Sequence, residues 1–174
     1  MDTTKCIKTR RSRRLFLDKD IPENKVIQIL EAGINAPSSV DCQPWHFIIV
    51  KNKIKLEKLA KLKIKDGHKH ILTAPLSIIV CVDIKKSPSR YLEDGVTATQ
   101  NMLLMINELS LGSVYLSASK ISKKKLAQEI RNILSIPETI MPITILPVGY
   151  FDSSEQLDNK ELVNLKSITH YNQW

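Results

Sequence analysis

The stretch that decides the fold is Ile34-Asn-Ala-Pro-Ser-Ser-Val-Asp-Cys-Gln-Pro-Trp-His-Phe-Ile-Ile-Val50, which changes its structural period twice. Apolar residues at helical spacing precede it, and a run of large apolar residues from Trp45 to Val50 closes it, so a helix ends and a strand begins here. We expect this strand to be buried on both faces. The loop between them, residues 37–44, has two prolines that restrict its backbone and several hydrogen-bonding side chains. By spacing alone, an ordinary helix–strand connection is a better interpretation than a ligand-binding loop.

A cluster of arginines lies upstream of this stretch, in Arg10-Arg11-Ser12-Arg13-Arg14. Four guanidinium groups in five residues repel one another, so keeping them together is favoured mainly when an anion neutralises them. The planar guanidinium suits phosphate, and Ser12 adds a hydroxyl group. A solvated basic turn, a nuclear-localisation signal and an RNA-binding patch remain alternative interpretations of these residues alone.

Together the two segments resemble the signature of the FMN-dependent nitroreductase family, with R-R-S-x-R followed at the expected distance by A-P-S-S-x-x-x-Q-P-W. The resemblance extends from the arginine cluster to Gly149 and returns at the C-terminus. It implies an α+β fold, namely a three-layer α-β-α sandwich with a central, mainly antiparallel sheet flanked by helices. It also implies a homodimer, built from a single domain over residues 1–174 whose C-terminal extension, residues 151–174, packs on the partner subunit.

The same resemblance implies which residues bind FMN. The arginine cluster would hold the phosphate and the ribityl chain, with Arg11 on the ribityl or pyrimidine side and Arg13 facing outward. The loop after Ala36 would line the flavin ring from the opposite subunit, and the segment from Leu111 to Ser119 would pass close to flavin N5. The complete set of expected FMN contacts is Arg10, Arg11, Ser12, Arg14, Pro37, Ser38, Ser39, Gln43, Ser117 and Ala118.

The implied activity is an NAD(P)H oxidoreductase that uses FMN in a ping-pong cycle. Hydride would pass from NADH or NADPH to the flavin and then to a small electrophile such as a nitroaromatic or a quinone. No catalytic side chain is required, and the sequence has no GxGxxG motif for a stably bound dinucleotide. The main alternative is an enzyme of the same fold with other chemistry, such as reductive dehalogenation, flavin fragmentation or ring oxidation.

Two further features bear on the site that the resemblance implies. Many nitroreductases have additional helices over the flavin after the strand that ends near Asp83, whereas here only residues 84–90 are available, so we expect an open site with little lid. Larger relatives place a basic residue near the C-terminus against the FMN phosphate. Lys160 and Lys166 are candidates for that contact, and neither belongs to the expected set.

The remaining segments predict packing elements. Helices are expected from Pro22 to about Gly33, over residues 53–64, over residues 87–109 and from Ser122 to Leu134. Buried strands are expected over residues 75–82 and 142–150, because both are rich in β-branched residues. Residues 66–70 include His68 and His70 without a third metal ligand nearby, so we expect a solvent-exposed turn rather than a metal site.

Composition limits the other function classes. The formal net charge is +8, which favours anionic partners, and a basic nucleic-acid-binding module is the alternative from a different class. That alternative predicts aromatic residues among the basic ones, and only Phe16 lies near the arginine cluster, so no nucleic-acid partner is expected. Three cysteines without CxxC spacing argue against disulfides and zinc and favour the cytoplasm. No apolar run approaches the length of a membrane span.

Overall fold

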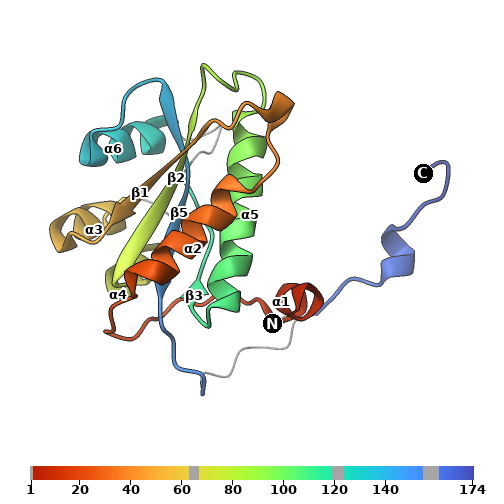
Figure 1. Cartoon of the computed structure of the whole chain (residues 1–174), viewed down its shortest axis with the longest axis horizontal. Helices are drawn as coiled ribbons and strands as arrows, with labels where there is room; N and C mark the ends of the chain where they lie inside the picture. The colour runs from red at the N-terminus through yellow and green to blue at the C-terminus, as the bar shows by residue number, and fades with distance from the viewer. Residues whose placement is uncertain (1, 63–66, 119–123, 155–160) are drawn as a thin grey trace.

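A computed structural model gives the architecture and describes residues 2–62, 67–118, 124–154 and 161–174 (Figure 1). The helices and strands follow the order α1 (Thr3–Thr9), α2 (Glu23–Ile34), β1 (Trp45–Val50), α3 (Lys53–Ala60), α4 (Gly67–Thr73), β2 (Leu76–Asp83), α5 (Tyr91–Glu108), β3 (Gly112–Ser113), β4 (Leu116–Ser117), α6 (Lys124–Leu134) and β5 (Ile140–Gly149). The described residues also form the 3-10 turns η1 (Ser39–Asp41) and η3 (Leu165–Ile168).

The sheet is built around β2 and β5, which pair along most of their lengths. The strand order is β1-β2-β5-β3, with β4 also pairing β5, and every pair of these strands is antiparallel. Seven of the eight residues of β2 are buried, because helices cover both of its faces. The predicted α+β sandwich with a mainly antiparallel sheet is therefore confirmed.

Two hydrophobic cores lie on opposite faces of the sheet, as the alternation of side chains along a strand requires. Ile78 and Val80 of β2 pack with α2 and α5 in the first core, whereas Ile79 and Cys81 pack with α3, α4 and α6 in the second. Figure 1 shows α2 and α5 together on one side of the sheet and α3 and α6 on the other. The sandwich thus has three layers.

Helix α5 packs unusually close to the sheet, and its small residues explain why. A Cβ atom added to Gly95 would lie 2.6 Å from Cγ1 of Ile143 in β5, a distance that side chains do not tolerate. Ala98 and Thr99 are fully buried in the same face, and the Thr99 hydroxyl lies 2.8 Å from the Thr144 hydroxyl of β5. These small residues therefore serve packing within the chain.

The structure corrects several predictions from the sequence. Strand β1 is not buried on both faces: it lies at the edge of the sheet and pairs only with β2, so Val50 is its one buried residue. Residues 67–70 do not form an exposed turn but the start of α4, with His70 buried near the carbonyl oxygen of Arg14. Helix α5 begins at Tyr91 rather than at residue 87. The predicted cap Ser122 lies outside the described residues.

The C-terminal segment is exposed in the single chain. Residues 161–174 are all exposed, and in Figure 1 the segment extends away from the sandwich. Its exposed large apolar side chains are Leu162, Val163, Leu165, Ile168, Tyr171 and Trp174. Contiguous exposed apolar side chains commonly mark an interaction surface.

Candidate functional site

The arginine cluster is an extended segment that leaves α1 and runs beside β3. Asp2 caps α1 by accepting a hydrogen bond from the Lys5 N–H at 2.9 Å, and the helix ends at Thr9. Ser12 then forms a parallel β-bridge with Ser113, and the Arg13 N–H donates to the Ser113 carbonyl oxygen at 3.0 Å. The backbone of the cluster is thus attached to the sheet, and its side chains project from that attachment.

A small hollow of about 10 Å³ lies where Arg10 and Arg11 meet the C-terminal end of α5, and Asn107 and Ser113 also line it. The Ser113 side chain is only 4% exposed, and within the described part of the chain its Oγ has no hydrogen-bond partner. An unsatisfied buried hydroxyl is unfavourable unless a ligand or water completes it. Two arginines that line the same hollow as this hydroxyl supply donors suited to an anion.

The other two arginines of the cluster are placed differently. Arg13 was expected to face outward, but its guanidinium carbon lies 4.1 Å from the centre of the Phe151 ring, and the residue is half-buried. The reason is Gly112, where any Cβ would lie 2.7 Å from Cβ of Arg13, so the bare backbone lets Arg13 lie across β3. Arg14 is exposed and does not line the hollow.

The loop after α2 is held at the opposite end of α5. The Ser39 N–H donates to Oδ1 of Asp94 at 2.9 Å, and the Thr97 hydroxyl donates to the Pro37 carbonyl oxygen at 3.1 Å. Within the loop, the Gln43 N–H donates to Oγ of Ser38 at 3.0 Å. Pro37, Ser38, Ser39 and Gln43 therefore lie together in one loop, in which Pro37 and Gln43 are exposed and the two serines are half-buried.

The same loop has an uncommon backbone. Val40, Asp41 and Gln43 have φ angles of 47°, 54° and 44°, in the left-handed region that favours glycine. Val40 is β-branched, for which this conformation is rare, and it is 94% exposed. Such a backbone persists only where surrounding contacts determine it, and it is common at functional sites.

Ser117 and Ala118 lie between these two regions, on β4 and just after it. Ser117 pairs with Thr144 and is half-buried, whereas Ala118 is fully buried and its N–H donates to the Ile143 carbonyl oxygen at 2.9 Å. The N–H of Ala118 is thus already used within the sheet. Two residues before Ser117, partial burial raises the pKa of the Tyr115 phenol above its ordinary value.

Within one chain, the arginine cluster and the loop do not meet. The loop contacts α5 at Asp94 and Thr97, and the arginine hollow contacts α5 at Asn107. Residues 97 and 107 are ten positions apart, which corresponds to about 15 Å along a helix. The ten predicted contacts therefore fall into two groups at opposite ends of α5, with Ser117 and Ala118 between them.

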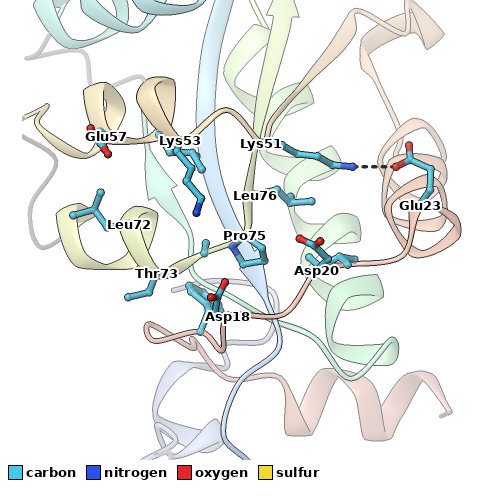
Figure 2. A pocket seen from close by; sticks show the side chains of 14 residues that line it. Asp18, Asp20, Glu23, Lys51, Lys53, Glu57, Leu72, Thr73, Pro75 and Leu76 are labelled. Carbon is cyan, nitrogen blue, oxygen red and sulfur yellow. Dashed lines mark hydrogen bonds and ion pairs between the residues drawn. The ribbon is translucent and has the colours of Figure 1, made fainter.

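A second, larger hollow of about 990 Å³ lies elsewhere, between the start of α2, α3, α4 and the start of β2 (Figure 2). Its charged lining consists of four carboxylates and two amines, namely Asp18, Asp20, Glu23, Glu57, Lys51 and Lys53. Lys51 and Glu23 form an ion pair at 3.1 Å. The six charged side chains together give the hollow a net negative charge. This negative charge repels an anionic cofactor, so the larger volume of this hollow does not make it the cofactor site.

Two contributors were missed from the sequence. Ser113 lies in the segment predicted to approach the flavin, but no local signal distinguished it from Ser117; only its unpaired buried hydroxyl does. Asp94 stands in the first turn of α5, where an acidic residue is ordinarily a partner of the helix dipole. Its contact with Ser39, 55 positions away, depends on the tertiary structure.

Two other features are absent from the described residues: a cluster of metal ligands and a helix that could span a membrane. No group of three or more metal-ligating side chains was found among residues 2–62, 67–118, 124–154 and 161–174. In the same ranges, no helix is long and apolar enough to cross a membrane.

Comparisons with known proteins agree with this architecture. The model of the Nitroreductase family matches residues 7–71, which include both the arginine cluster and the loop. A protein of Methanothermobacter thermautotrophicus, provisionally named NADH dehydrogenase/NAD(P)H nitroreductase, is 36% identical, and the match covers 100% of this chain and 88% of that protein.

Solved structures give the same result. A protein of Parabacteroides distasonis with the same provisional name has a TM-score of 0.89 and 31% identity, over 99% of this chain and 98% of that one. An FMN-dependent nitroreductase from Clostridium difficile has a TM-score of 0.84 and 28% identity, over 99% and 100% of the two chains. The resemblance inferred from the two motifs is confirmed: this chain belongs to the nitroreductase family.

Proposed function

We propose that this protein, an FMN-dependent NAD(P)H oxidoreductase, reduces small electrophiles such as nitroaromatics or quinones by a ping-pong mechanism in sites shared between two subunits. The observation that carries the proposal is the arginine hollow. Arg10 and Arg11 converge there with a buried Ser113 hydroxyl that has no partner within the described residues. This donor set fits the phosphate and ribityl oxygens of FMN.

The arginine cluster acts by binding and charge. We assign Arg10, Ser12 and Arg14 to the phosphate and Arg11 to the ribityl or pyrimidine side, as the motif implies. Arg14 is exposed in the single chain, so its guanidinium is available to a ligand at the surface. Positive charge near the pyrimidine also stabilises the negative charge that a reduced flavin carries.

The loop from Pro37 to Gln43 acts by shape. We propose that Pro37, Ser38 and Ser39 lie against the flavin ring bound by the other subunit, with Gln43 reaching the same site. Support comes from the exposure of the loop and from its separation from the arginines of its own chain, about 15 Å along α5. The loop thereby excludes water from one side of the ring and orients the reactants.

A homodimer follows from this division, because one chain has only half of each pocket. Helix α5 has a stripe of exposed residues, Glu93, Val96 and Gln100, that points away from the sheet. Antiparallel pairing of two such helices brings the loop end of one beside the arginine end of the other. The exposed apolar side chains of residues 161–174 form a second surface for contact with the partner. We propose that residues 151–174 pack on the partner subunit.

The reaction requires no acid or base from the chain. When bound, FMN supplies the hydride chemistry at N5. We assign the contact beside N5 to Ser117, with Ala118 behind it, since the N–H of Ala118 is used within the sheet. NADH or NADPH and then the acceptor occupy the same open face in turn.

We infer the class of acceptor from how little of the chain covers the open face of the flavin. The connection between β2 and α5 spans only residues 84–90, as predicted, so no long lid is available from that segment. An open face favours small planar acceptors over an elaborate substrate, which makes dehalogenation or ring oxidation the weaker alternative. We also propose a cytoplasmic location, which three free cysteines support.

Spectroscopy of the purified protein tests the proposal. We expect flavin absorbance that NADH or NADPH bleaches without oxygen, and that nitroaromatics or quinones restore. A Ser38→Trp variant should lose more than about tenfold in turnover, because an indole fills the space of the ring; Gln128→Trp, at an exposed position of α6 on the other face of the sheet, is the control. Colourless protein, or normal turnover of Ser38→Trp, would contradict the proposal.

A further inference from the structure

The carboxylate of Asp94 is buried at a place where no ion pair with another described residue explains it. Asp94 is 4% exposed in the first turn of α5. Its Oδ1 accepts the Ser39 N–H at 2.9 Å, and its Oδ2 lies 4.0 Å from Sγ of Cys42. Burying a carboxylate is unfavourable unless hydrogen bonds compensate, so its two loop contacts are the reason it can be there.

The same turn of α5 holds the loop at further points. The indole N–H of Trp45, at the end of the loop, donates to the Asp94 carbonyl oxygen at 3.0 Å. The Thr97 hydroxyl donates to the Pro37 carbonyl oxygen at 3.1 Å, at the beginning of the loop. Asp94 contacts the middle, so this turn of α5 holds the segment from Pro37 to Trp45 at its beginning, middle and end, and the Asp83 N–H of β2 also donates to the Pro44 carbonyl oxygen at 2.8 Å.

This attachment acts against the conformation that the loop would adopt alone. Val40, Asp41 and Gln43 all have positive φ angles, which non-glycine residues disfavour. The hydrogen bond from the Gln43 N–H to Ser38 closes the loop locally, but the bond to Asp94 is the one that ties Ser39 to a rigid element. Without it, the loop can relax away from its strained form.

We propose that Asp94 is a positioning residue for the reaction: it holds Ser38 and Ser39 in the form that lines the flavin ring bound by the other subunit. This inference rests on the proposed function, because it requires the loop to act in a shared site. Asp94 does not touch the cofactor or the substrate itself. Its effect is transmitted through the Ser39 N–H.

Three variants test the role of the Asp94 carboxylate. We expect Asp94→Ala to lower kcat by more than about tenfold. Asp94→Asn keeps an oxygen that can accept the Ser39 N–H and should recover part of that loss. Glu57→Ala is the matched control: it removes an exposed acid of α3, on the other face of the sheet, and should leave kcat unchanged.

Mixed dimers separate positioning from general damage to the fold. Asp94→Ala chains are paired with Arg10→Ala/Arg14→Ala chains through two different affinity tags. In a shared site, each mixed dimer has one pocket with intact arginines from the first chain and an intact loop from the second. We expect it to regain roughly half of the wild-type turnover, well above the turnover of either parent.

The results of these experiments distinguish the role of Asp94 from the proposed function. Absence of recovery in the mixed dimer, or normal kcat for Asp94→Ala, overturns the role of Asp94. If instead Arg10→Ala/Arg14→Ala binds FMN like the wild type, the proposed function itself fails. Should Asp94→Ala not fold, Asp94→Ser, whose side chain is too short to reach the Ser39 N–H, enters the same mixing experiment with the same criteria.

Discussion

The arginine cluster and the loop from Pro37 to Gln43 are held in contrasting ways. The cluster is attached by its backbone, through the bridge of Ser12 to Ser113, and leaves charged side chains to project. The loop has a strained backbone and is attached by side chains of α5. In the proposed site, the arginine cluster therefore provides affinity through its charge, whereas the loop provides geometry through tertiary contacts.

The largest expected effect concerns the charged half. Arg10→Ala or Arg14→Ala removes a charge-assisted hydrogen bond worth about 1.5 to 3 kcal/mol, which weakens FMN binding roughly 10- to 150-fold. Isothermal titration of apoprotein with FMN measures it, with Arg90→Ala, an exposed arginine at the start of α5, as control. Unchanged affinity in both variants would assign the phosphate to another region.

An intermediate effect tests the scaffold that both halves share. Burial raises the pKa of the Cys81 thiol from 9.0 to about 12, and nearby Arg131 lowers it only in part. Above about pH 9 the thiol ionises in the unfolded chain but not in the folded one, so the unfolded chain binds fewer protons and stability falls with rising pH. The slope reaches about 1.4 kcal/mol per pH unit.

Urea unfolding at about pH 8 and about pH 10 measures this slope. Cys81 of β2 pairs with His46 of β1, the strand that directly follows the loop. We therefore expect the loop and the arginine cluster to unfold in the same transition. Cys81→Ala should be less stable overall but should lose less stability between the two pH values. An identical pH dependence in the two proteins would show that other groups control alkaline unfolding.

The smallest expected effect concerns the strained half. Val40→Gly should raise the free energy of unfolding by up to about 1 kcal/mol, because glycine adopts a positive φ without the penalty of a β-branched residue. Thermal unfolding measures the gain, and Ser110→Gly, at a φ of 57° outside the loop, is the matched control. A loss of stability in Val40→Gly would mean that the Val40 side chain makes a stabilising contact.

Much of this was predictable from local sequence. Runs and periods of apolar residues predict β2, β5, α2 and α6, and the two motifs alone indicate the family. Errors arose where burial depends on distant neighbours. The apolar run from Trp45 to Val50 looks like a central strand, but its position at the sheet edge is set by which strands pair.

The sequence by itself determined the chemistry that is available: an arginine cluster suited to phosphate, a proline-bounded polar loop, and a run of apolar, β-branched residues that forms the buried strand β2. Only the tertiary structure decided that the cluster and the loop lie at opposite ends of α5, that the buried Ser113 hydroxyl has no partner among the described residues, and that Asp94 holds Ser39. The physical reason is range. Periodicity and turn chemistry act within a few residues, whereas the contact of Asp94 with Ser39 joins residues 55 positions apart and exists only after the core has packed.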